Sequence, residues 1–284
     1  MYYITVIIAV ILFGGGFALS DVYRRLRSSS IRSSLESSLI GAIAGLTVLL
    51  AVSGGFQATP FTLFIAFLSA LNSIAFMFFS FKALDCANLS VYSLFSMLGG
   101  MALPFFQGII FYGENLTVAK LVAFLLITVA LTLTVSRGRS KNGIPYYIGV
   151  FILNGMSGAL SKIFTSSPYE KTSPEWFSVW IAFFTAIVSL LLLLTLFRKS
   201  EEKFTLKALA VSVGNGLFNR IANMLLVVAL VHIDASVQYT LVTGGVIIVS
   251  TVISLFGKSK PSKKELLSVA VAFLGTLALF LIKA

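Results

Sequence analysis

The chain has 284 residues, of which 58% are hydrophobic and 11% are charged, and its mean hydropathy is +1.00. This balance excludes an ordinary soluble domain. Because the apolar runs are long and continuous, it predicts an all-α membrane protein with too little chain left over for a soluble enzyme domain. The net charge of +11 is assigned to connecting segments that set orientation and meet anionic lipid, so nucleic-acid binding is not expected.

Ten apolar segments follow one another along the chain, and each is predicted to be a transmembrane helix. They cover residues 2–20, 37–53, 61–81, 88–111, 117–135, 145–163, 174–197, 205–231, 235–256 and 265–282. The first is predicted to be a span and not a cleaved signal, because no basic region precedes it and no small-residue cleavage site follows. The connections are short apart from 198–204 and 21–36. The latter is rich in Ser and Arg and is predicted to be a solvated connector or a surface-lying helix.

Lysine and arginine are divided unequally between the two sides of such a bundle. The odd-numbered connections carry sixteen of them, the even-numbered connections and the two ends carry four, and Arg220 lies within a segment. Positive residues concentrate in the cytoplasm, so both termini are predicted to lie outside a cell (inner or plasma) membrane.

The chain lacks the residues of the common cofactor sites. Cys86 is the only cysteine, so neither a disulfide nor a cysteine-based metal site is expected. No phosphate-binding loop of the Gly-x-x-x-x-Gly-Lys-Ser/Thr type is present, which excludes an ATP-driven motor of that kind. No cofactor and no metal are therefore predicted.

The eighth segment carries the most polar residues. Asn215, Asn219 and Asn223 are spaced at i, i+4 and i+8, so they share one face of a helix, and Arg220 lies close to that face. At 1.5 Å per residue, Arg220 is ~22 Å from one end of the segment and ~16 Å from the other. An arginine at that depth is costly and marks an ion or substrate pathway by default, although membrane asparagines also serve as hydrogen bonds between helices.

Further candidates lie in four other segments. The third segment has Asn72 and Ser73, and Ser73 falls opposite Asn219 at an offset of 146 residues. Asn154 lies in the sixth segment, where it could bind substrate or aid helix packing. Tyr92 and Tyr239 lie early in the fourth and ninth segments and are predicted to face a cavity.

An internal repeat divides the chain into residues 1–140 and 141–284. Residues 83–100 and 229–245 both open with Ala-Leu, continue with Ser-Val and close with Gly-Gly. Five spans in each half would force the halves into opposite orientations, which predicts two inverted five-helix repeats with a site between them. The two Gly-Gly pairs are predicted to be flexing points.

These features resemble the drug/metabolite transporter superfamily, EamA-like branch. Gly113, Glu114, Leu116 and Thr117 match its junction motif, while Lys258 stands at the acidic position in the second half. The resemblance implies a ten-helix transporter. It also implies cytoplasmic termini in many members, which is the reverse of what the lysine and arginine count predicts.

The sequence thus predicts a secondary transporter of a small polar metabolite, an amino acid or other organic anion, working by alternating access. Arg220 would hold the anionic group. Two alternatives stay open: a flippase for a lipid or lipid-linked sugar, and a non-transporting membrane scaffold whose polar stripe joins helices. Proton coupling, exchange and uniport are equally compatible with the sequence, as are a monomer and a homodimer.

Overall fold

The structure, a computed structural model, describes residues 2–27, 30–86, 89–133, 143–196, 205–255 and 263–282. Over these residues it contains ten helices and no strand. The helices are α1 (Tyr2–Leu26), α2 (Ile31–Val52), α3 (Pro60–Cys86), α4 (Leu89–Tyr112), α5 (Val118–Leu133), α6 (Ile144–Ser166), α7 (Pro174–Leu196), α8 (Leu206–Leu230), α9 (Ala235–Leu255) and α10 (Lys263–Leu281). Most helix ends lie within three residues of the predicted segment ends.

Seven helices are long and apolar enough to cross a bilayer, whose hydrocarbon core takes about 20 helical residues. They are α1 to α4 and α6 to α8. The apolar parts of α5, α9 and α10 are shorter, at 10–17 residues. The chain is therefore a helical membrane protein with several spans, and the figure of ten spans stays a prediction.

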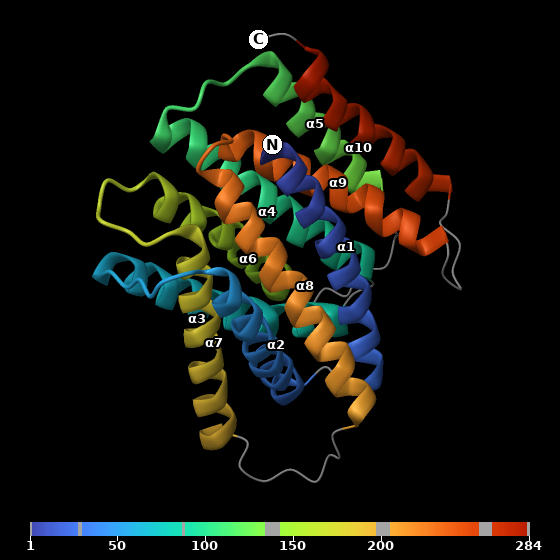
Figure 1. The fold of residues 1–284 in the computed structure, drawn as a ribbon. Helices are drawn as coiled ribbons and strands as arrows, with labels where there is room; N and C mark the ends of the chain where they lie inside the picture. The colour runs from blue at the N-terminus through green and yellow to red at the C-terminus, as the bar shows by residue number, and fades with distance from the viewer. Residues whose placement is uncertain are drawn as a thin grey trace.

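Most of the helix contacts join the first five helices to the last five. α1 packs on α8 and α9, α6 packs on α3 and α4, and α2 packs on α7 and α8. In Figure 1, α5 and α10 lie side by side at one edge of the bundle, with α2, α3 and α7 gathered at the opposite edge. The central helices are thus enclosed by helices from both halves of the chain.

The predicted connector 21–36 is wrong in its extent. α1 continues to Leu26 and α2 begins at Ile31, so most of the polar stretch is helical. Ser33, Ser34 and Ser37 are buried, and the Ser30 hydroxyl accepts a hydrogen bond from the Ser33 N–H to cap α2. Serine side chains can satisfy themselves within a packed helix, and hydropathy alone cannot reveal this.

Glycines let the central helices approach closely. Gly41 of α2 and Gly216 of α8 meet backbone to backbone, since a Cβ on Gly41 would lie 2.9 Å from Gly216 Cα. The two Gly-Gly pairs that were predicted to be flexing points lie within the continuous helices α4 and α9. A Cβ on Gly99 would strike the Phe151 backbone of α6, and one on Gly245 would lie 2.8 Å from Val10 of α1. Close packing is the structural reason for these glycines.

Candidate functional site

A cavity of about 320 Å³ lies among α1, α2, α3, α4, α6, α7, α8 and α9. The nine residues singled out in the sequence all line it: Arg220, Asn219, Asn223, Asn215, Asn72, Ser73, Tyr92, Tyr239 and Asn154. Five helices that are distant in sequence supply them. The structure brings the set together, and their role in binding a substrate stays a prediction.

Arg220 projects from the middle of α8 and is half-buried. A glycine opposite makes room for it, because a Cβ on Gly45 of α2 would lie 2.5 Å from Arg220 Cγ. No Asp or Glu lines the cavity. Within the described part of the chain, no carboxylate forms an ion pair with the guanidinium. The cavity therefore holds a fixed positive charge that those residues do not neutralise.

The asparagine stripe of α8 is ordered by its own hydrogen bonds. Asn219 Nδ2 donates to Asn215 O at 2.9 Å and to Asn215 Oδ1 at 2.7 Å, and Asn223 Nδ2 donates to Asn219 O at 2.7 Å. Ser20 of α1 donates to Asn215 Oδ1 at 3.2 Å. Among the described residues, no group donates to the side-chain oxygens of Asn219 and Asn223. These two acceptors are thus available to a ligand.

Asn72 and Asn154 join helices while lining the cavity. Asn72 Nδ2 of α3 donates to Leu153 O of α6 at 2.9 Å. Asn154 Nδ2 of α6 donates to Ser96 O of α4 at 2.6 Å. The packing role that was left open for Asn154 is therefore present, and Asn72 makes a contact of the same kind.

The remaining predicted residues also make internal contacts. The Ser73 hydroxyl donates to Ser69 O within α3 at 2.8 Å. The buried Tyr92 hydroxyl donates to Ser80 Oγ at 3.2 Å, and the Tyr239 hydroxyl donates to Gly158 O at 3.3 Å. Both tyrosines face the cavity from one turn inside their helices, as predicted.

The aromatic and serine walls of the cavity were not predicted from the sequence. Phe13, Phe17, Phe76 and Phe81 line it from α1 and α3. In a sequence, a phenylalanine that faces a cavity cannot be distinguished from one that faces lipid. Only the glycine run before Phe17 could have indicated that this face of the first helix is special. Ser37 and Ser38 also line the cavity, and they were missed because the predicted segment 37–53 placed them at its very end.

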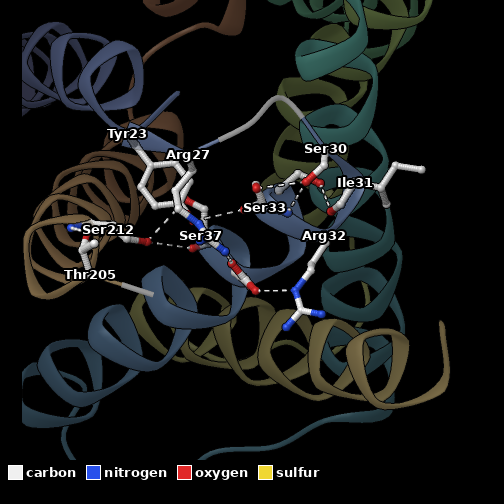
Figure 2. Close-up of polar contacts among 12 residues, drawn as sticks. Tyr23, Arg27, Ser30, Ile31, Arg32, Ser33, Ser37, Thr205 and Ser212 are labelled. Atoms are coloured by element: carbon white, nitrogen blue, oxygen red, sulfur yellow. Dashed lines mark hydrogen bonds and ion pairs between the residues drawn. The ribbon is translucent and has the colours of Figure 1, made fainter. Parts of the chain in front are cut away.

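A polar network fixes the place where α1, α2 and α8 meet beside the cavity (Figure 2). Glu36 accepts hydrogen bonds from both Arg27 and Arg32, and the Tyr23 hydroxyl donates to Ser33 O. Ser212 of α8 donates to Ser37 Oγ at 3.4 Å. These contacts hold the first turns of α2 against α1 and α8, which positions the serine wall.

Away from the cavity, Glu114 ties two connections to α6. Gly113 has φ +65°, which turns the chain after α4, and the buried Glu114 carboxylate then pairs with Lys162 at 2.8 Å. The same carboxylate accepts from Ser236 Oγ and from the backbone N–H groups of Ala235 and Ser236, so it caps α9. Burial raises the pKa of Glu114, but these hydrogen bonds outweigh it and the pKa is lowered. Beside it, Lys120 pairs with Asp234 at 2.7 Å.

The described ranges contain no group of three His, Cys, Asp or Glu side chains that could hold a metal ion. What the cavity offers is a guanidinium, amide and hydroxyl groups, and aromatic rings. These groups can donate and accept hydrogen bonds.

No protein-family model and no curated protein matches the chain. Solved structures do resemble it. One described only as "Crystal structure of protein" superposes with a TM-score of 0.77, covering 98% of this chain and 95% of that chain at 18% identity. At that identity the likeness shows a shared fold and nothing about activity.

Proposed function

We propose that this membrane protein is a secondary transporter that moves a small polar metabolite with an anionic group, such as an amino acid or other organic anion. It would work by alternating access and belong to the EamA-like branch of the drug/metabolite transporter superfamily. The observation that carries the proposal is Arg220, a permanent cation facing a cavity that no acidic residue lines. A guanidinium presents a planar fork of donors that suits a carboxylate or phosphate.

The other polar groups fit the remainder of such a substrate. The unpaired side-chain oxygens of Asn219 and Asn223 would accept hydrogen bonds from an ammonium or hydroxyl group. A cavity of about 320 Å³ is of the size that small-molecule sites have. A scaffold whose stripe only joined helices would pack its centre dry, so the cavity favours transport.

The architecture supports two inverted five-helix repeats, residues 1–140 and 141–284. Shifting every helix number by five turns the α1–α8 contact into α6–α3, and α1–α9 into α6–α4. Tyr92 hydrogen-bonds to Ser80, and Gln238 hydrogen-bonds to Leu226. Each residue of the second pair follows its counterpart in the first by 146 positions, so one contact recurs in the two halves. Inverted repeats around a central cavity are typical of secondary transporters. Both termini outside the cell membrane, a monomer or homodimer, and coupling to protons or to exchange remain part of the proposal.

A thermal-shift screen of the purified protein tests the substrate class. The panel would hold amino acids, organic acids, sugar phosphates and quaternary amines, with wild type and Arg220→Gln side by side. A ligand that binds the native state raises the free energy of unfolding by mass action, by about 2.7 kcal/mol at a hundredfold excess over Kd. The melting temperature rises with it. The proposal expects an organic anion to stabilise the wild type and not Arg220→Gln.

Lys171→Gln is the matched control, because it removes a positive charge from the 167–173 connection and leaves the cavity intact. It should respond as the wild type does. Equal stabilisation of Arg220→Gln and wild type by every active compound would show that Arg220 is structural. Stabilisation by lipid head groups alone would point to a flippase, and a complete lack of response would favour a scaffold.

A further inference from the structure

A second, smaller space lies beside the cavity, and we call it the side chamber. It measures about 60 Å³ and lies between α3, α6, α7 and α8. Five serines contribute to its wall: Ser69, Ser73, Ser157, Ser161 and Ser178. Six residues line both this space and the main cavity, so the two spaces are contiguous: Ser73, Ser157, Ser161, Arg220, Asn223 and Val227.

Four of the five serine hydroxyls in the side chamber donate within their own helices. Those of Ser73, Ser161 and Ser178 each donate to the backbone carbonyl four residues earlier, at 2.8–3.0 Å. Such bonds add to a carbonyl that the helix already uses, and rotation about the Cβ–Oγ bond redirects the proton. Ser157 Oγ has no hydrogen-bond partner among the described residues. The hydroxyls can therefore donate to a ligand at little cost in helix stability.

The charge of the side chamber has one sign. Its lining contains the Arg220 guanidinium and no acidic residue. A positive charge with no acidic neighbour repels a metal cation and attracts an anion. The size sets a further limit, because about 60 Å³ holds a few waters or one compact ion and cannot hold an amino acid or a sugar.

From this lining, charge and size we propose that the side chamber binds a small inorganic anion of halide type, held by Arg220 and the serine hydroxyls. The proposal deepens the proposed function and rests on it, because the same guanidinium faces the substrate cavity. One positive charge neutralises one negative charge, so the small anion and the anionic group of the substrate would compete for Arg220. The bound halide would then act as the ligand of the substrate-free state.

Bromide titration of the purified full chain tests the proposal. The melting temperature is followed with sodium bromide replacing sodium HEPES at constant sodium, since that bulky sulfonate cannot enter the side chamber. Wild type should be stabilised saturably by bromide. Replacing two neutral hydrogen-bond donors that line only the side chamber, in the Ser69→Ala/Ser178→Ala double variant, should weaken bromide binding by about tenfold or more. Ser38→Ala, which alters only the main cavity, should behave as wild type.

Two outcomes would overturn the proposal: bromide no better than HEPES for the wild type, or equal bromide midpoints for the double variant and the wild type. A crystal grown in bromide should also show its anomalous signal beside Arg220, and a signal only elsewhere would count against the side chamber. Uptake of organic anions measured in halide-free buffer separates the two proposals. Uptake without a bromide effect would support the transporter and contradict the halide site. A bromide effect without uptake would contradict the transporter.

Discussion

At the scale of single residues, both polar and apolar side chains line the cavity. Arg220 and the three asparagines of α8 stand out in an apolar segment because each is costly in lipid unless it faces the interior. Phe13 and Phe76 line the same cavity, yet lipid-facing phenylalanines have the same hydropathy and occur throughout the chain. Only packing distinguishes them, and packing is not encoded in a single-residue pattern.

Gly45 offers a test of how tightly Arg220 is positioned. A Cβ at this position would lie 2.5 Å from Arg220 Cγ and 2.8 Å from its Cβ, so Gly45→Ala must displace the side chain. We expect the protein to fold while its affinity for the stabilising anion falls by about tenfold or more, since a displacement near 1 Å is enough to disturb a bidentate contact. Thermal-shift titration with that anion measures the loss.

The comparison variant is Gly55→Ala, in the connection between α2 and α3, where a Cβ would meet nothing within 4 Å. Its affinity should equal that of the wild type. If Gly45→Ala also bound normally, the guanidinium position would not depend on α2.

At the scale of helices, composition predicted most of the elements and failed where serine was dense. Long apolar runs fix nearly all the helix ends to within a few residues, because a bilayer demands about 20 such residues. The stretch 21–36 was misjudged because Ser33 and Ser34 are buried and Glu36 pairs with two arginines. Those pairings depend on how α1 and α2 meet, which hydropathy does not report.

The start of α9 is held by a residue that is distant in sequence. Glu114 lies in the connection between α4 and α5, and its carboxylate caps α9. Glu114→Gln would leave Lys162 buried without its counter-charge, and breaking a buried pair typically costs about 3–5 kcal/mol. We expect a clear fall in melting temperature at pH 7. Glu170→Gln, at an exposed position in the 167–173 connection, should leave the melting temperature nearly unchanged.

The pH dependence has a definite sign. Because the pKa of Glu114 is lowered on folding, its contribution to stability is present above the unfolded pKa, about 4.3, and is lost as the pH falls through the lower folded pKa. Melting curves at pH 3 to 7 should therefore show a smaller gap between wild type and Glu114→Gln at the acid end. A gap that stayed constant or widened would mean that the carboxylate does not carry the effect.

At the scale of the whole molecule, the repeat is a prediction that rests on short matched strings, Ala-Leu, Ser-Val and Gly-Gly. The contacts between helices agree with the exchange of the two halves. Membrane orientation is predicted in two opposite ways. The lysine and arginine count places the termini outside, whereas the resemblance to the transporter superfamily places them in the cytoplasm.

Cysteine labelling decides the orientation. In a Cys86→Ser background, Tyr169→Cys places a thiol at an exposed position in the connection between α6 and α7, and Ser140→Cys places one in the Arg- and Lys-rich connection before α6. The lysine and arginine count predicts that a membrane-impermeant maleimide added to intact cells modifies position 169 and spares position 140. The reverse pattern would place both termini in the cytoplasm.

The measurement that tests the central claim most directly is counterflow in proteoliposomes with radiolabelled amino acids and organic acids, comparing wild type with Arg220→Gln. Matched elution volumes and circular dichroism would establish that both are folded. The account predicts saturable accumulation of at least one organic anion by the wild type and at least a hundredfold slower accumulation by Arg220→Gln, as expected when a desolvated charge pair worth ~3 kcal/mol is lost. Accumulation at the wild-type rate in Arg220→Gln would contradict the account, because the anionic group would then be held elsewhere.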